Sequence, residues 1–116
     1  MANINEPSGG MEQEEKDIES YRAMQQQLQI VMLQKQQMQM QTDEIEHALE
    51  ELNKASGAIY RIVGPIVIQS NKDELSKDLQ TKREEMNSRL EILGKQEERL
   101  KKNLTDLRKM IEQKRR

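Results

Sequence analysis

The chain has 116 residues, of which 34% are charged and 2% aromatic, with no phenylalanine, tryptophan or cysteine and a formal net charge of −2. This length allows one domain at most. The lack of cysteine excludes disulfides, cysteine-based zinc sites and thiol nucleophiles. With so few aromatic residues, the apolar supply suits a narrow helical seam better than a globular core. Two classes remain open on composition alone, a long coiled coil and a disordered chain.

Charge and hydropathy argue against two further classes of function. The small net charge gives no overall basic footprint for nucleic acid. No apolar run is long enough to span a bilayer, and the N-terminus lacks a secretory pattern. We therefore expect a soluble, cytoplasmic protein that binds neither nucleic acid nor membrane.

The first ten residues differ in composition from the rest of the chain. They include Pro7 followed by Ser-Gly-Gly, so we expect residues 1–10 to form a disordered tail. The predicted domain fills residues 11–116. It is expected to contain a helix over 11–56, a β-hairpin over 58–69 and a second helix over 71–115.

A heptad seam marks the first predicted helix. Steps of three and four residues define ten positions, eight of them apolar or aromatic: Tyr21, Met24, Leu28, Val31, Lys35, Met38, Thr42, Ile45, Leu49 and Leu52. A pattern sustained over this length predicts a coiled-coil helix and argues against disorder.

A short apolar island, AIYRIVGPIVIQ, follows at residues 58–69. Its β-branched residues favour extended structure, and its central Gly-Pro suits a two-residue type II′ turn. We therefore predict a hairpin, which we expect to be the assembly site through Ile59, Tyr60, Ile62, Val63, Gly64, Pro65, Ile66, Val67 and Ile68.

The predicted hairpin has large apolar groups on both faces and no further strand in the chain to pair with. A lone two-stranded hairpin is marginal in water, and its open edges invite aggregation. We infer that other chains supply the missing strands and the covering layer. The alternative is a hydrophobic cap that folds back onto its own coiled coil.

The second predicted helix starts at a capping-box pair, Asn71 and Glu74. Its seam is expected to run through Leu75, Leu79, Lys82, Met86, Leu90, Leu93, Glu97, Leu100, Leu104, Leu107 and Ile111. The two four-residue steps on either side of Met86 predict a stutter that locally unwinds the supercoil.

The charges at the two chain ends indicate how the helices pair. Residues 11–20 carry five acids and one lysine, whereas residues 100–116 carry seven bases and two acids. Folding the helices back antiparallel places these oppositely charged ends together, and each sign also suits its own helix terminus. The expected fold is therefore mainly α, a long antiparallel two-helix coiled coil joined by one β-hairpin.

Four stretches of the chain form a recognisable set: SYRAMQQQLQIVMLQKQ at 20–36, HALEELN at 47–53, IYRIVGPIVIQSNKDEL at 59–75 and LGKQEERLKKNL at 93–104. Together they resemble prefoldin, in particular the archaeal β-type subunit. The single hairpin points to the β-type. The resemblance implies a hexamer of two α-type and four β-type subunits, whose hairpins form intermolecular β-barrels. It also implies that unfolded polypeptides are held at the coil tips and passed to a group II chaperonin, without ATP.

No residue pattern in the chain indicates catalysis, a metal or a cofactor. The only histidine, His47, lies between glutamates and is read as a solvated helix residue. No glycine-rich phosphate loop is present, which argues against direct ATP use. We therefore expect a protein that is not an enzyme.

Apolar residues near the two chain ends are the candidate client-binding residues, because helix ends fray and methionine adapts to varied apolar partners. They are Met11, Ile18, Tyr21, Met24, Leu104, Leu107, Met110 and Ile111. The alternative for these residues is that they only pack against one another. For the whole chain, the alternative function is a structural scaffold or tether that binds no client.

Overall fold

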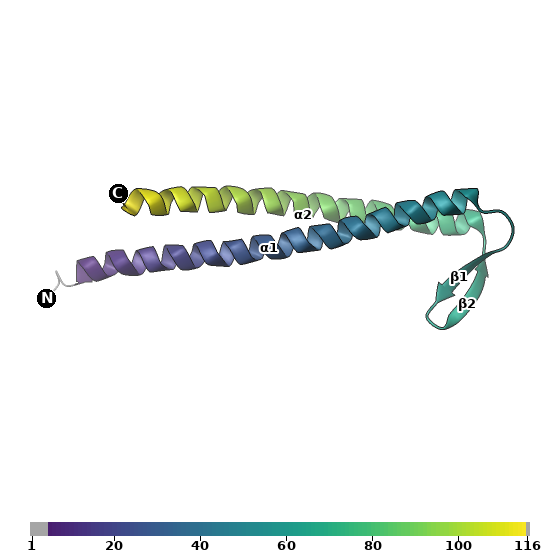
Figure 1. Ribbon diagram of the computed structural model, residues 1–116, viewed down its shortest axis with the longest axis horizontal. Coiled ribbons are helices and arrows are strands. Elements are labelled where there is room, and N and C mark those ends of the chain that lie inside the picture. The colour runs from purple at the N-terminus through teal and green to yellow at the C-terminus, as the bar shows by residue number, and fades with distance from the viewer. Residues whose placement is uncertain (1–4, 116) are drawn as a thin grey trace. The chain divides into compact units, whose positions relative to one another are not determined.

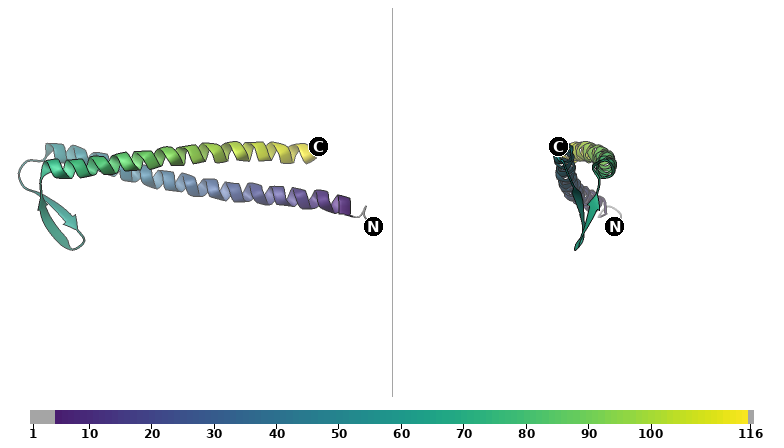
Figure 2. Two further views of the ribbon diagram at one scale, coloured as in Figure 1. Left: turned by 180° about the vertical axis from the view of Figure 1, so that it is seen from behind. Right: turned by 90° about the vertical axis from the view of Figure 1, so that its right-hand side faces the viewer.

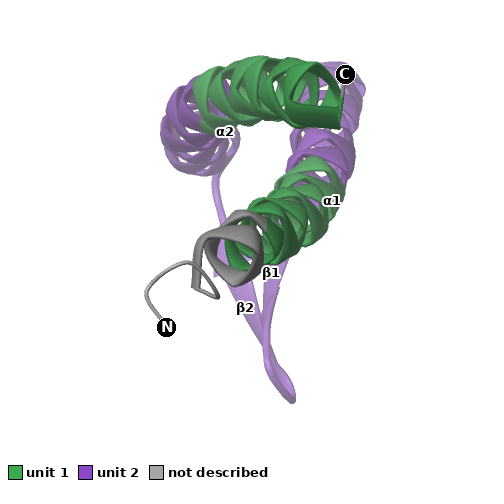
Figure 3. Cartoon of the chain, turned by 90° about the vertical axis from the view of Figure 1, so that its left-hand side faces the viewer, with its two compact units in different colours: residues 1–34, 93–116 green, residues 35–92 purple. Residues whose placement is uncertain are grey.

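The computed structural model describes residues 5–115, with side chains from residue 11 onward. Helix α1 (Asn5–Lys54) is followed by strands β1 (Ile59–Val63) and β2 (Ile66–Ser70) and by helix α2 (Lys72–Arg115) (Figure 1). Two helices joined by a single hairpin are the fold that the sequence predicts. The chain divides into unit 1, Met1–Gln34 with Leu93–Arg116, and unit 2, Lys35–Ile92 (Figure 3).

Helix α1 begins at Asn5 rather than at residue 11, so most of the expected tail is helical. Pro7 lies in the first turn, where backbone N–H groups have no acceptor within the helix, so its missing N–H removes no hydrogen bond. Residues 1–4 of the expected tail lie outside the described residues. At its other end α1 stops at Lys54, and Gly57 follows with a φ of 90°.

In unit 1, the N-terminal part of α1 runs antiparallel to the C-terminal part of α2. Asp17 pairs with Lys114, and Glu14 pairs with Arg115. The seam between them contains buried Val31 and Leu104 and the half-buried residues Ile18, Tyr21, Met24, Leu28, Leu100, Leu107 and Ile111. The charge pairing that the sequence predicts is confirmed here.

In unit 2, the C-terminal part of α1 buries Ile45, Leu49 and Leu52. The half-buried seam residues of α2 in this unit are Leu75, Leu79, Met86 and Leu90. Thr42 is also buried, and its hydroxyl donates to the carbonyl oxygen of Met38 at 2.9 Å. Thr42, one of the two polar positions in the predicted seam, is thus satisfied inside its own helix, as a buried hydroxyl requires.

One position of the α2 seam is wrong in the prediction. Lys82 is exposed, whereas its neighbour Arg83 is half-buried. With Arg83 in the seam, the two consecutive four-residue steps fall on either side of Leu79, from Leu75 to Arg83, so the stutter lies at Leu79 rather than at Met86. Both basic side chains have long apolar stems that can cover a seam, and the sequence pattern did not discriminate between them.

The hairpin forms as predicted. Strands β1 and β2 are antiparallel, and the register pairs Val63 with Ile66, leaving Gly64 and Pro65 as the loop. Gly64 has a φ of 58°, and proline holds the next φ negative, which is the combination of a type II′ turn. Figure 2 shows the hairpin standing away from the helices of unit 2.

Asn71 ends the hairpin and caps α2. Its Oδ1 accepts a hydrogen bond from the backbone N–H of Glu74 at 2.7 Å, and its Nδ2 donates to Glu74 Oε2 at 3.3 Å. The predicted capping pair is confirmed, although here the return bond comes from the amide side chain rather than from the cap's backbone.

Candidate functional site

The hairpin surface, residues 59–68, exposes apolar side chains on both faces. Because side chains alternate along a strand, Tyr60 and Ile62 share one face with Val67, opposite Ile62 in the register. Val63, Ile66 and Ile68 lie on the other face. All six are exposed, with Ile62 at 76% and Val67 at 62%. The predicted two-faced apolar hairpin is confirmed.

The hairpin does not fold back as a cap over its own helices. An ion pair links β1 to α2, where Arg61 Nη1 donates to Asp78 Oδ2 at 3.1 Å. The sheet has only the two strands among the described residues. The outer edge of each strand therefore offers unpaired backbone groups. Because the apolar side chains of the hairpin are exposed rather than packed on the helices, the fold-back alternative is wrong.

The candidate client-binding residues fall into three groups in unit 1. Met11 and Met110 are exposed, at 65% and 41%. Leu104 is buried in the seam. The remaining five, Ile18, Tyr21, Met24, Leu107 and Ile111, are half-buried. The structure thus gathers these residues on two paired helix segments, with most of them packing partly against the other helix.

An ionic clasp, formed by Glu14, Asp17, Lys114 and Arg115, joins the same two segments. Lys114 Nζ donates to Asp17 Oδ2 at 3.0 Å, and Arg115 Nε donates to Glu14 Oε1 at 2.7 Å. Asp17 is 6% exposed and also accepts a hydrogen bond from Gln13. The hydrogen bond from Lys114, followed by that from Gln13, holds the pKa of Asp17 below its ordinary value.

The sequence indicated opposite charges at these ends but not a buried carboxylate. The signal was present, because the heptad steps backward from Tyr21 reach Asp17 and then Glu14. Both positions belong to the seam, and both are filled by acids that face bases of α2. The seam of unit 1 therefore changes from apolar to ionic toward the chain ends.

A second set of apolar side chains lies off the seam and was not singled out from the sequence. It comprises Ile30, Met32, Leu33 and Met40 of α1 and Ile92 of α2, all exposed. For Ile30, Met32 and Leu33 the signal is composition, since residues 23–34 contain no charged residue in a chain that is 34% charged.

Other chemistry finds no support in the described part of the chain. Within residues 5–115 no cluster of three or more histidine, cysteine, aspartate or glutamate residues is placed to hold a metal ion. His47 lies exposed on α1. Among the described helices, none is both long and apolar enough to cross a membrane.

Each unit contains two antiparallel helix segments, and one β-hairpin has open faces. This architecture is that of a coiled-coil hairpin protein. Residues 15–116 match the family model described as "Prefoldin subunit". The chain belongs to the prefoldin subunit family and is a prefoldin-type chaperone subunit of a multi-subunit complex.

Similar proteins agree with the β-type resemblance. Prefoldin subunit beta of Methanococcoides burtonii is 42% identical over 92 residues, covering 78% of this chain and 79% of the relative. That of Pyrococcus furiosus is 35% identical over 97 residues, covering 82% and 80%. The crystal structure of the prefoldin beta subunit from Thermococcus strain KS-1 superposes with a TM-score of 0.82 at 31% identity, covering 87% of this chain and 90% of that one.

Proposed function

We propose that the chain is a β-type subunit of an ATP-independent holdase in the cytoplasm, with no catalytic step and no cofactor. Four such chains and two α-type subunits form a hexamer through intermolecular β-barrels built from their hairpins. The helix ends of unit 1 capture unfolded polypeptides, which pass to a group II chaperonin.

The single observation that carries the proposal is the exposure of the hairpin surface on both faces. Six large apolar side chains in water are unfavourable, at roughly 1.5–3 kcal/mol for each one left unburied. The two open edges add unpaired backbone groups. Both needs are met when strands from other chains extend and cover the sheet, and membership in the prefoldin subunit family supports that assembly.

Client capture is supported by the side chains at the helix ends. Met11 and Met110 are exposed on the two paired segments, and methionine is flexible enough to contact varied apolar groups. One subunit offers little apolar area, so binding strength is expected to come from several subunits acting on one chain.

A light-scattering assay tests the proposal. A chemically denatured enzyme is diluted into buffer with the assembled complex, and its aggregation is followed. Removing residues 1–20 and 108–116 should abolish suppression of aggregation while the native mass shows the same number of subunits. If the truncated complex still suppresses aggregation as well as the wild type does, the assignment of client binding to the helix ends is wrong.

A milder pair of variants separates side-chain contact from helix truncation. The double change Met11→Gln and Met110→Gln keeps good helix formers and should weaken suppression severalfold. The matched control, Met32→Gln with Met40→Gln, changes two other exposed methionines on α1 and should leave the suppression of aggregation intact. If the wild-type complex itself fails to suppress aggregation, the scaffold or tether function replaces the holdase.

A further inference from the structure

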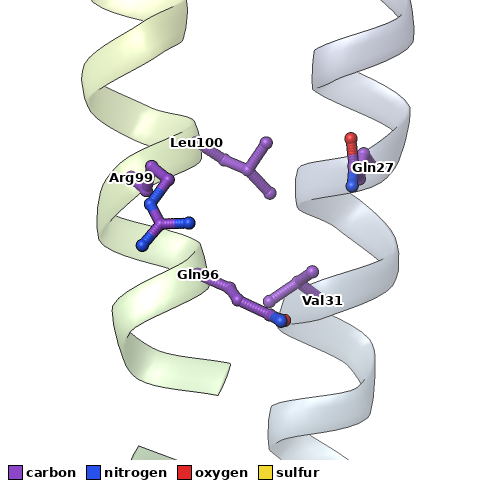
Figure 4. Close-up of a pocket in the computed structure, with 5 residues that line it drawn as sticks. All are labelled: Gln27, Val31, Gln96, Arg99 and Leu100. Carbon is purple, nitrogen blue, oxygen red and sulfur yellow. The ribbon is translucent and has the colours of Figure 1, made fainter. Parts of the chain in front are cut away.

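A groove between the two helix segments of unit 1 has no role in the function proposed above. It has a volume of about 200 Å³ and is lined by Gln27, Val31, Gln96, Arg99 and Leu100. Figure 4 shows Leu100 and Gln96 extending from α2, and Val31 from α1, into the space between the helices. Val31 is buried and Leu100 half-buried, so the floor is apolar.

The size and the polar groups of the groove suit a piece of peptide. Its volume lies below the roughly 300–1,000 Å³ typical of small-molecule pockets, which leaves room for one apolar side chain. Gln27 and Gln96 are exposed at the rim. A side-chain amide both donates and accepts, as the N–H and C=O groups of an extended backbone require.

The charge at the rim is positive and unmatched. The structure records no hydrogen bond or ion pair for the Arg99 side chain among the described residues. The residues three and four positions away along α2 include no carboxylate; they are Lys95, Gln96, Lys102 and Asn103. Across the groove, residues 23–34 of α1 carry no charge. A guanidinium in this setting favours a carboxylate from outside the chain.

We propose that this groove is a subsite for unfolded client segments in which a leucine-sized apolar residue is followed by an acidic one. The apolar side chain enters between Val31 and Leu100, the glutamine amides hold the backbone, and Arg99 binds the carboxylate. The proposal rests on the holdase function. The groove is too small to be the interface with a second folded copy. Only five residues line it, whereas a stable interface buries roughly 1,000 Å² of surface or more.

Methyl-resolved NMR of the full-length chain tests the subsite directly. The probe is the capped hexapeptide Gly-Ser-Leu-Asp-Ser-Gly, titrated against chain labelled at valine and leucine methyl groups. We expect saturable shifts at Val31 and Leu100 with a millimolar dissociation constant. A peptide with asparagine in place of aspartate should bind about threefold more weakly, and one with alanine in place of leucine about tenfold more weakly.

Two exposed basic residues of α2 provide the matched variants. Arg99→Gln should erase the preference for the aspartate peptide over the asparagine peptide, whereas Lys102→Gln should preserve it. A third variant, Val31→Met, should reduce binding of every peptide by filling the groove.

Three outcomes overturn the subsite: no shift at Val31 or Leu100, equal affinity for the aspartate and asparagine peptides, or shifts that follow the concentration of the chain alone, which indicate a second copy. If these appear while aggregation is still suppressed, the holdase function stands without the subsite. Specific peptide shifts without any suppression contradict the holdase function instead.

Discussion

Polar side chains inside the seam show how single residues decide the pairing of the helices. Thr42 is almost fully buried, and its hydroxyl is satisfied by the carbonyl of Met38. Asp17 is buried as well, but its partners are Lys114 across the seam and Gln13 one turn earlier. The hydrogen bond of Thr42 lies within α1 and does not affect the register between the helices. The ion pair of Asp17 forms only when its position on α1 lies opposite Lys114 on α2.

Asp17→Asn should therefore lower the thermal stability of unit 1. The carboxylate loses its charge and with it the ion pair to Lys114. Thermal unfolding followed by circular dichroism measures the effect at about pH 7. The control is Glu15→Gln, which neutralises an exposed acid two residues away and should change little, as surface charges do. Equal melting temperatures for wild type and Asp17→Asn contradict a structural role for the clasp.

The same ion pair should make stability depend on pH in a defined direction. The pKa of Asp17 is lowered in the folded chain from an ordinary value of 3.8, chiefly by the hydrogen bond from Lys114. A lowered pKa contributes stability that is complete above the ordinary value and is lost as the pH falls through the folded one. The difference between wild type and Asp17→Asn should thus shrink below about pH 4. A difference that stays constant to about pH 2 excludes this linkage.

At the residue scale, periodicity predicted most of the seam but failed where the side chain was charged. Two adjacent basic residues, Lys82 and Arg83, both have stems able to pack, so only the structure shows which one does. Asp17 was treated as part of a charged flank because burial of a carboxylate depends on Lys114, which lies 97 residues further along the chain.

Short polar and glycine signals set the ends of the elements. Asn71 caps α2 with two bonds to Glu74, and Gly64 supplies the positive φ of the turn. These signals are local, and for that reason the hairpin and the start of α2 could be predicted within a residue or two. The start of α1 could not, because a proline in the first turn of a helix is as permissible as one in a tail.

Asn71→Ala tests the cap. Removing the acceptor for the Glu74 N–H should lower the free energy of unfolding by about 1 kcal/mol. Urea unfolding followed by circular dichroism gives this value. Asn87→Ala, at an exposed position inside α2, serves as the control and should be neutral or slightly stabilising, since alanine is the better helix former. Similar losses from both changes argue against a specific cap.

The two glycines at 64 and 94 should respond to alanine with opposite signs. Neither has an atom within 4 Å of an added Cβ, so crowding plays no part. At Gly64 the positive φ of 58° disfavours alanine by about 1–2 kcal/mol, which hydrogen exchange of the hairpin amides will register as faster exchange. Gly94 lies inside α2, where alanine should stabilise by about 1 kcal/mol. A stabilised hairpin in Gly64→Ala contradicts the type II′ turn.

At the scale of the whole molecule, the helices bury their apolar seams within the chain, whereas the hairpin leaves its apolar side chains exposed. Each helix segment buries its seam against the other helix within its unit, whereas the hairpin leaves both faces and both edges open. This contrast could be predicted from the sequence, because the number of predicted strands and the apolar residues on both of their faces can be read from it. The groove at Arg99 was not foreseen, since it depends on which side chains the pairing brings together.

The native mass of the full-length chain tests the central claim, that other chains bury the hairpin. Wild type should assemble into a multi-chain species, alone or with an α-type partner. The double change Ile62→Asp and Ile68→Asp should reduce it to single chains of 13.6 kDa. Ile92→Asp alters an isoleucine on α2 whose exposure lies between those of Ile62 and Ile68 and should leave the assembly whole. An unchanged mass for the hairpin variant, with its helices still folded, contradicts the account.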